Sequence, residues 1–235
     1  MNLNDPKLVA EEYANEKGLV GRRDAYRYAD GLDAPALAIG AVLDVQPRRV
    51  LEVGCGPGEA AERIAASGVE VEALDISERM VELTRARGVN ARVGDVQELP
   101  FEDESFDAAL AGWMLYHVPD VERGVAELAR VLRPGGRLVA VTNRREHLRE
   151  LRELLGGDFP THNFSDENGA EILLRHFAQV EERDAGGWIN FPDRAAVEAY
   201  VKSSRSLWER DLPANFEGTL RVRRAPVIYV ATKAT

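Results

Sequence analysis

The chain is poor in cysteine and has no long hydrophobic run. Its 235 residues include one cysteine, so no disulfide can form within the chain, which fits a reducing compartment. The longest apolar stretch, residues 36–43, contains a glycine and is much too short to span a bilayer. Residues 1–18 are polar and lack the pattern of a secretory leader. These absences predict a cytoplasmic protein that is not inserted in a membrane.

The sequence also lacks an excess of basic residues and the ligand spacing of a metal site. The formal net charge is −10, and the basic clusters at 22–23, 144–145 and 221–224 are short and scattered, as on solvated surfaces. Binding to nucleic acid depends on Lys and Arg side chains that neutralise phosphates. No His, Asp or Glu residues are spaced as metal ligands are. We therefore expect no nucleic-acid partner and no bound metal.

Strand-like and helix-like segments alternate along the chain. The length fits one large domain, and 45% hydrophobic with 30% charged residues is ordinary for a globular protein. The alternation runs from residue 49 to about 156 and predicts an α/β fold with a doubly wound, mostly parallel seven-stranded sheet. The expected strands are 49–54, 70–75, 90–93, 106–112, 136–142, 178–184 and 226–232. The expected helices are 58–67, 77–87, 121–132, 145–155 and 166–176.

The most informative segment is the glycine-rich run at residues 50–58, Val-Leu-Glu-Val-Gly-Cys-Gly-Pro-Gly. Its first half is typical of a buried central strand, in which the charge of Glu52 is costly unless a partner neutralises it. Its glycines remove side chains from the turn into the next helix and let the backbone approach a ligand. This arrangement predicts a nucleotide-type cofactor site. The residues of the turn are Gly54, Cys55, Gly56 and Gly58.

The spacing of these glycines narrows the choice of cofactor. A Rossmann NAD loop is usually G-x-G-x-x-G with a pyrophosphate at the helix N-terminus. Here the pattern is G-x-G-x-G, and Glu52 would repel a pyrophosphate but attract an ammonium group. The run resembles the E/D-x-G-x-G-x-G motif of the class I S-adenosylmethionine-dependent methyltransferases. Cys55 within it is better explained as a small packing residue than as a catalytic thiol.

Three further segments resemble that family in the expected order. The second strand ends in Asp75, followed by Ile76 and by Ser77, which is also a plausible helix N-cap. Residues 93–107 are similar to the family segment G-D-x-x-x-L-P-F-x-D-x-S-F-D, and residues 132–138 to its L-x-P-G-G turn before the fifth strand. The resemblance covers about residues 49–143. It points to the type 11 group, which contains ubiquinone- and menaquinone-biosynthesis-like methyltransferases of small molecules.

The resemblance implies transfer of a methyl group from S-adenosylmethionine to a small-molecule acceptor, with S-adenosylhomocysteine as product. It implies that Asp75 binds the ribose hydroxyls, Asp95 the adenine amino group and the Val96 N–H the adenine ring, and that the last strand is antiparallel. Motifs of base methylation, Asn/Asp-Pro-Pro-Tyr and Pro-Cys, are absent after the strand at 106–112. The expected cofactor-binding residues are Glu52, Gly54, Cys55, Gly56, Gly58, Asp75, Ile76, Asp95, Val96 and Ala111.

Two other functions stay open at this point. A protein that binds the cofactor without methyl transfer would have the same motifs. An NAD-dependent oxidoreductase would explain the glycine loop and Asp75, but not Glu52 or the Gly-Asp95 segment. A monomer and a homodimer are equally compatible with the sequence, and the acceptor atom is not specified by it.

Candidate catalytic and acceptor-binding residues follow the fourth strand. Ligands of doubly wound folds lie at the carboxyl ends of strands, and there His117 is the best-placed base near neutral pH. Packing or capping at the start of the next helix is the slightly favoured alternative for His117. Trp113 and Tyr116 are equally compatible with an acceptor wall and with core packing.

The remaining segments are expected to cover the site. In a single domain of residues 1–235, we assign 1–46 to an N-terminal helical cover and 47–184 to the cofactor-binding core. Residues 185–224 form a lid-like excursion and 225–235 the last strand. Aromatic side chains suit a partly wet pocket wall. Those of the cover are Tyr13, Tyr26 and Tyr28, the first two being acceptor-pocket candidates, and those of the excursion are Trp188, Tyr200 and Trp208.

Overall fold

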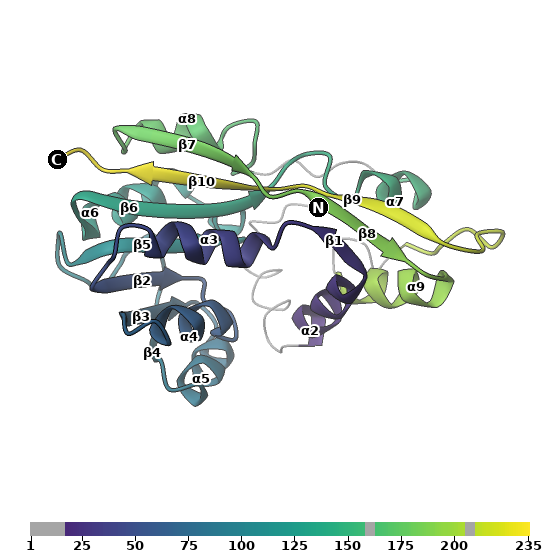
Figure 1. Ribbon diagram of the computed structural model, residues 1–235, viewed down its shortest axis with the longest axis horizontal. Helices are drawn as coiled ribbons and strands as arrows, with labels where there is room; N and C mark the ends of the chain where they lie inside the picture. The colour runs from purple at the N-terminus through teal and green to yellow at the C-terminus, as the bar shows by residue number, and fades with distance from the viewer. Residues whose placement is uncertain (1–16, 158–162, 205–209) are drawn as a thin grey trace.

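The computed structural model describes residues 17–157, 163–204 and 210–235, and its centre is a seven-stranded sheet (Figure 1). The strand order is β4-β3-β2-β5-β6-β10-β7, with parallel pairing from β4 to β6 and β10 antiparallel to both neighbours. The predicted doubly wound sheet and its antiparallel last strand are therefore confirmed. The strands are β2 Arg49–Val53, β3 Glu70–Asp75, β4 Asn90–Val93, β5 Phe106–Gly112, β6 Leu132–Asn143, β7 Gln179–Asp184 and β10 Pro226–Thr232.

Helices cover both faces of this sheet. On one face the small side chains of α3, together with α4 and α5, pack on a buried cluster that includes Ala38, Val42 and Val81. On the other face α6 and α8 pack on a cluster that includes Leu128 and Leu173. These helices are α3 Ala34–Leu43, α4 Glu59–Ala65, α5 Glu78–Ala86, α6 Val121–Val131 and α8 Gly169–Leu174. None of the helices in the described ranges has the length and hydropathy of a bilayer-spanning segment.

A second, three-stranded antiparallel sheet lies beyond the carboxyl ends of the parallel strands (Figure 1). Its order is β1-β8-β9, and Asp30 Oδ1 reinforces it by accepting a hydrogen bond of 3.0 Å from the Trp188 N–H. Hydrophobic side chains of α7, α9 and the 3-10 helix η1 pack together under it. The elements are α2 Lys17–Asp24, η1 Ala25–Tyr28, β1 Ala29–Gly31, α7 Arg149–Leu154, β8 Gly187–Phe191, α9 Arg194–Ser203 and β9 Leu220–Arg224.

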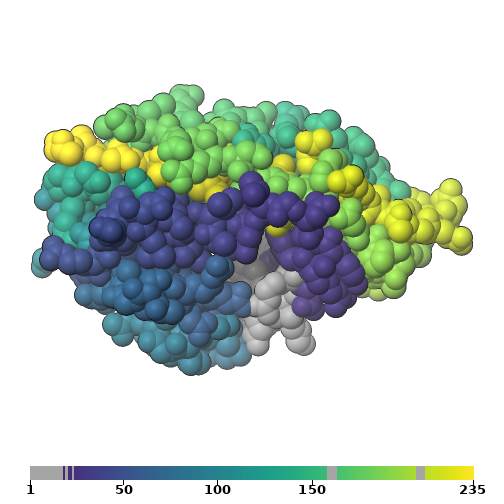
Figure 2. Space-filling model, in the orientation of Figure 1, coloured from purple at the N-terminus to yellow at the C-terminus, as the bar shows by residue number. Residues whose placement is uncertain are grey.

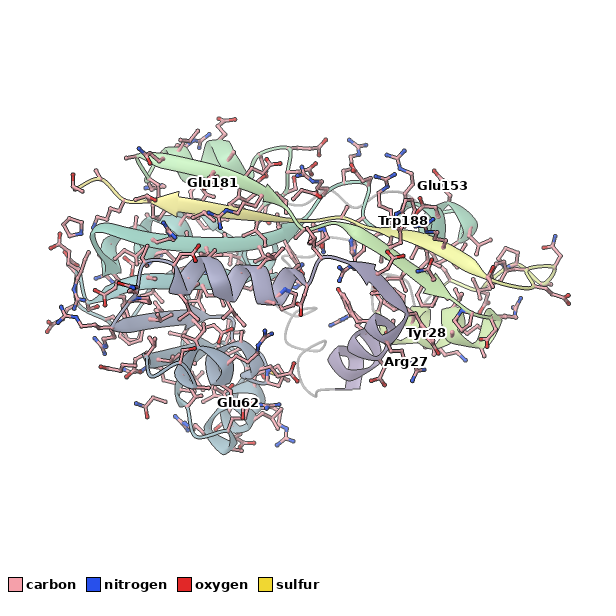
Figure 3. All side chains as sticks on the ribbon, in the orientation of Figure 1. Arg27, Tyr28, Glu62, Glu153, Glu181 and Trp188 are labelled. Atoms are coloured by element: carbon pink, nitrogen blue, oxygen red, sulfur yellow. The ribbon has the colours of Figure 1, made fainter. Side chains whose placement is uncertain are left out.

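This second sheet corrects part of the expected cover. Residues 1–46 were expected to be helical, but β1 interrupts them and α3 packs on the main sheet. The excursion at 185–224 contains two strands besides its helix. Trp188 lies on the three-stranded sheet (Figure 3). The guanidinium carbons of Arg221 and Arg223 lie 4.3 and 5.0 Å from the centroid of its ring, and Trp188 does not line the cavity described below.

The chain order of the strands places a crevice between β2 and β5. The segment after β2 continues to β3 on one side, while β5 returns to pair with β2 on its other side. Such a switch point is where doubly wound sheets bind ligands. The glycine-rich turn after β2 and Trp113 after β5 therefore meet at the same edge of the sheet.

Candidate functional site

The three glycines of the turn leave its backbone uncovered by side chains where it faces the crevice. Gly54, Gly56 and Gly58 have φ of +62°, +52° and +80°, a region that favours glycine. A Cβ on Gly58 would lie 2.6 Å from Thr84 Oγ1, so this glycine allows α4 and α5 to pack closely. A Cβ on Gly56 would meet nothing within 4 Å. The absence of a side chain at Gly56 therefore leaves space that no neighbouring protein atom fills.

Glu52, in β2 just before the turn, is a buried acid without a full set of partners. The residue is 5% exposed, and its Oε2 is fully buried with no hydrogen-bond partner within the described part of the chain. Burial raises its pKa from 4.5 to about 8; a hydrogen bond from the Ala61 backbone opposes this rise and the charge of Asp75 adds to it. A buried carboxylate of this kind is stabilised by a cation. Glu52 therefore fits a ligand with an ammonium group.

Asp75, at the end of β3, holds the turn in place. The residue is 8% exposed. Its Oδ2 accepts from the Gly56 N–H and its Oδ1 from the Ser77 N–H, both at 2.9 Å. Burial raises the pKa of Asp75, and its backbone hydrogen bonds oppose that rise. Ser77 caps α5 by accepting from the Met80 N–H at 3.4 Å, as the sequence predicted.

Gln97 holds the carboxylate of Asp95, the next predicted cofactor-binding residue, in position. Asp95 Oδ1 accepts from the Gln97 N–H at 2.9 Å, and Asp95 Oδ2 accepts from the Gln97 side-chain amide at 2.8 Å. The same amide also accepts from the Asp120 N–H at 3.0 Å, which ties this loop to the start of α6. Sequence reasoning did not select Gln97, because a single glutamine two residues after an acid carries no recognisable pattern.

The residues after β5 are held in an unusual backbone conformation. Trp113 has φ of +53°, which costs a non-glycine residue roughly 1–3 kcal/mol and is common at functional sites. Its indole Nε1 donates to Asn143 Oδ1 at 3.2 Å. Tyr116 and His117 follow in a 3-10 turn, with ring centroids 4.4 Å apart. The other strained residue nearby, Leu148 with φ of +59°, lies after β6 and lines the same cavity as Trp113.

One cavity of about 1250 Å³ joins these groups. Figure 2 shows α2 and the segment that carries α4 and α5 on the same face of the molecule. Ile76 is 59% exposed beside it. Cys55 is 5% exposed with its Sγ 3.4 Å from Thr84 Oγ1, and burial raises the pKa of its thiol. The predicted residues that line the cavity are Glu52, Gly54, Cys55, Gly56, Asp75, Ile76, Asp95, Val96, Trp113, Tyr116, His117 and Tyr26.

Two of the predicted site residues that the structure describes do not line this cavity. Gly58 packs against Thr84, as described above, and Ala111 is fully buried in the core. The neighbours of Ala111, Leu110 and Gly112, line the cavity in its place. Tyr13 lies outside the described residues, as does Trp208. Among the residues that are described, no three His, Cys, Asp or Glu side chains form a group that could hold a metal ion.

Several basic side chains of the cavity were not expected from the sequence. Arg152 of α7 and Arg224 of β9 line it, although the cluster at 221–224 was expected to be a solvated surface. His147 also lines it, and its Nδ1 accepts from the Ala225 N–H at 3.1 Å. In a neutral imidazole this leaves the proton on Nε2, so His147 is placed as a donor rather than a base.

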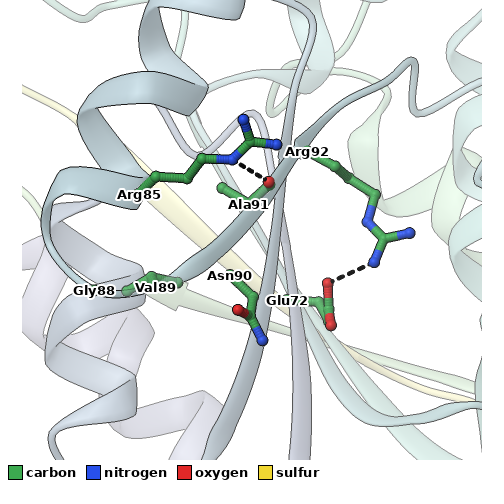
Figure 4. A pocket seen from close by; sticks show the side chains of 7 residues that line it. All are labelled: Glu72, Arg85, Gly88, Val89, Asn90, Ala91 and Arg92. Atoms are coloured by element: carbon green, nitrogen blue, oxygen red, sulfur yellow. Dashed lines mark hydrogen bonds and ion pairs between the residues drawn. The ribbon is translucent and has the colours of Figure 1, made fainter.

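A second depression, of about 730 Å³, lies at the β4 edge of the main sheet (Figure 4). Its charged groups are already engaged, since Arg85 Nε donates to the Ala91 carbonyl at 2.9 Å and Arg92 pairs with Glu72 at 3.0 Å. It lies away from the glycine-rich turn and shares no lining residue with the first cavity. We therefore place the candidate site in the first cavity.

The fold and the site together define an α/β protein with a ligand-sized cavity at the switch point of its sheet. Residues 51–140 match the model of a methyltransferase domain. A ubiquinone biosynthesis O-methyltransferase of Xanthomonas oryzae is 34% identical over 191 residues, which cover 71% of this chain and 80% of the relative. The chain belongs to the S-adenosylmethionine-dependent methyltransferases.

Two further proteins are similar to this chain, one in sequence and one in fold. An uncharacterized methyltransferase of Mycobacterium tuberculosis is 39% identical over 130 residues, 53% of each chain, so this chain matches about half the length of that curated relative. The crystal structure of an S-adenosylmethionine-dependent methyltransferase of Thermotoga maritima superposes with a TM-score of 0.62. It covers 96% of this chain and 98% of its own at 24% identity, which shows the shared fold.

The role of Asp75 can be tested by mutation. We expect Asp75→Ala to weaken S-adenosylhomocysteine binding by more than about tenfold, because hydrogen bonds to a charged group contribute roughly 1.5–3 kcal/mol. The variant also loses the anchor of the Gly56 N–H. Isothermal titration calorimetry gives the dissociation constant, and Asp44→Ala, an exposed acid at the end of α3, is the control. An unchanged dissociation constant for Asp75→Ala would remove this residue from the cofactor site.

Proposed function

We propose that the protein transfers a methyl group from S-adenosylmethionine to a small-molecule acceptor by in-line displacement. The observation that carries the proposal is the buried Oε2 of Glu52, which has no hydrogen-bond partner among the described residues, beside the uncovered backbone at Gly56. S-adenosylmethionine brings an ammonium group and a sulfonium, but no phosphate that Glu52 would repel. An NAD pyrophosphate at this turn would bring a like charge to a buried acid, which disfavours the oxidoreductase alternative.

Each predicted contact has a candidate group that lines the cavity. We assign Glu52 to the ammonium group and Asp75 to the ribose hydroxyls. We assign the carboxylate of Asp95 to the adenine amino group and the Val96 N–H to the adenine ring. Ile76 supplies an exposed apolar side chain against that ring. The family resemblance supports these assignments, and so does the shared cavity of the residues involved.

The chain's part in the reaction is mainly to position the reactants. When bound, S-adenosylmethionine would supply an activated methyl group, and its displacement needs close approach, alignment and exclusion of water. Trp113, Tyr116 and Tyr26 line the cavity and form the proposed acceptor wall. The strained backbone of Trp113 fixes the direction of this wall.

Calorimetry with both cofactors tests the proposal. We expect S-adenosylhomocysteine to bind and NAD not to bind under the same conditions. Formation of S-adenosylhomocysteine from S-adenosylmethionine, followed across a panel of small hydroxyl, amine, thiol and carbon acceptors, then tests turnover. Cofactor binding without turnover on any acceptor would favour the alternative of a non-catalytic binder. A monomeric or homodimeric state, the absence of a nucleic-acid partner and a cytoplasmic location stay predictions.

His117 is the candidate base for acceptors that must lose a proton. It lines the cavity after β5, next to the proposed acceptor wall. General-base catalysis contributes about 10²–10⁴-fold, so we expect His117→Gln to lower kcat by at least about 100-fold with S-adenosylhomocysteine affinity unchanged. Rates are measured against pH, because loss of a base also removes the acidic limb of the profile. A kcat within threefold of the original would leave His117 as a ring that packs on Tyr116.

A further inference from the structure

The cavity is larger than one cofactor requires. Ligand pockets usually have volumes of roughly 300–1,000 Å³, whereas this one measures about 1250 Å³. One part of its lining follows the carboxyl ends of β2, β3 and β4, where the proposed cofactor contacts lie. Another part comes from elements beside the three-stranded sheet. The residues of this second part that matter here are Arg22, Tyr26, Arg152, Tyr200 and Arg224.

This second part is basic in a protein whose formal net charge is −10. Two acids, Asp30 and Asp33, also line it, but backbone and side-chain donors engage them. Asp30 accepts from the Trp188 N–H at 3.0 Å and from the Asn190 amide at 3.1 Å. Asp33 caps α3 by accepting from the Ala36 N–H at 3.0 Å. These acids thus have structural partners of their own.

Arg224 is the most buried of the basic residues, at 5% exposed. Its Nη2 donates to the Leu32 carbonyl, and its guanidinium lies 5.2 Å from the centroid of the Tyr26 ring. Its Nε is fully buried and has no hydrogen-bond partner among the described residues, nor does any described acid form an ion pair with Arg224. A buried guanidinium with a free donor and no carboxylate is stabilised by an incoming anion.

Arg152, on α7, resembles Arg224 in that no described acid forms an ion pair with it. Its Nε donates to the His147 carbonyl at 3.4 Å, and within the described residues it forms no ion pair. Burial lowers the pKa of Arg152; Tyr200 opposes that effect, and the charge of Arg210 adds to it. Two positive groups on one cavity wall therefore have no matching negative charge in the described chain.

Two phenols complete this wall. Burial raises the pKa of both Tyr26 and Tyr200, so each hydroxyl keeps its proton and is available as a donor. Tyr26 is 41% exposed and lines the cavity. Tyr26, Arg22 and Arg152 also act electrostatically on Tyr200; the first raises its pKa and the two arginines lower it.

We propose that the acceptor carries an anionic group, a carboxylate or a phosphate, and that Arg152 and Arg224 bind it. This proposal rests on the proposed function, because it assigns a substrate class to the same cavity. The planar guanidinium presents donors in a fork that matches the oxygens of either anion. The anion would occupy the end of the cavity beside the three-stranded sheet, and the rest of the acceptor would extend toward the cofactor.

Three ring-matched probes test the preference for an anion. Benzoate, phenyl phosphate and neutral benzamide are titrated calorimetrically into the full chain saturated with S-adenosylhomocysteine. We expect at least one of the two anions to bind tenfold or more tightly than benzamide. The stronger of the two anions identifies carboxylate or phosphate as the recognised group. Equal affinities for all three probes, or no binding of either anion at millimolar concentration, would overturn the proposal.

A matched pair of arginine variants locates the anion. Arg152→Gln should reduce the preference for the anion at least tenfold, whereas Arg149→Gln, on the same helix but outside the cavity, should preserve it. Both variants should bind S-adenosylhomocysteine as the original protein does, and their melting temperatures check the fold. An equal loss in both variants, or none in Arg152→Gln, contradicts the assignment. Failure of the unmodified protein to bind S-adenosylhomocysteine would instead contradict the proposed function.

Discussion

Replacement of Gly56 by valine should abolish cofactor binding and leave the fold intact. A Cβ at Gly56 meets no protein atom within 4 Å, so the branched side chain would occupy the open space of the cavity. The only expected loss of stability comes from φ of +52°, which disfavours a β-branched residue. We expect no binding of S-adenosylhomocysteine by calorimetry at concentrations that saturate the original protein.

Gly68 offers a control for the backbone strain. It lies in the exposed turn between α4 and β3, has φ of +82°, and a Cβ there also meets nothing within 4 Å. Gly68 does not line the cavity. The Gly68→Val variant should therefore lose a similar amount of stability in a thermal melt and bind S-adenosylhomocysteine normally. Normal binding by Gly56→Val would show that the bare turn is not a cofactor contact.

The sequence predicted the main sheet well because each strand there carries a strong local pattern. The bounds of β3, β4, β5 and β10 agree with the prediction at every residue. The largest difference is in β6, expected to begin at residue 136 after a Pro-Gly-Gly turn. In the structure β6 begins at Leu132, directly after α6, and its pairing with β5 shifts register between Phe106 and Ala108. The turn motif is therefore accommodated as an irregularity inside the strand.

The three-stranded sheet could not be predicted in the same way. Its strands β1, β8 and β9 come from distant parts of the chain, and β1 is three residues long. Backbone pairing joins these strands and the contact of Asp30 with the Trp188 N–H reinforces it, and no local pattern encodes contacts across such a separation. The same reason applies to Arg152 and Arg224, which resemble surface residues in the sequence and meet at the cavity only through tertiary packing.

Replacement of Glu52 by glutamine should change cofactor binding and stability in opposite directions. Loss of one partner of a buried charge pair costs roughly 2–5 kcal/mol, so S-adenosylhomocysteine affinity should fall by about 30-fold or more. Without the cofactor, the variant no longer buries an ionisable acid and should melt at a higher temperature near pH 8. A gain of 1 kcal/mol corresponds to about 2–4 °C in a chain of this size. Calorimetry and thermal melts of the same samples measure both effects.

The folding stability should depend on pH through Glu52. The pKa of Glu52 is about 8 in the fold against an ordinary 4.5, so between these values the folded protein holds a proton that the unfolded chain releases. The contribution of Glu52 to stability is therefore fully present below pH 4.5 and is lost as the pH rises toward about 8. Glu52→Gln should remove this component of the stability profile.

Cofactor binding, in contrast to folding stability, should strengthen as the pH rises. An ammonium group selects the charged carboxylate, so Glu52 must release its proton when the cofactor binds below about pH 8. Affinity for S-adenosylhomocysteine should then rise by up to about tenfold for each pH unit from about pH 6 to about pH 8. Calorimetry in two buffers with different ionisation enthalpies counts the released proton directly. If Glu52→Gln kept the original affinity and the same pH profile, the carboxylate would not be the partner of the ammonium group, and the cofactor would have to be held by the Asp75 side of the cavity alone.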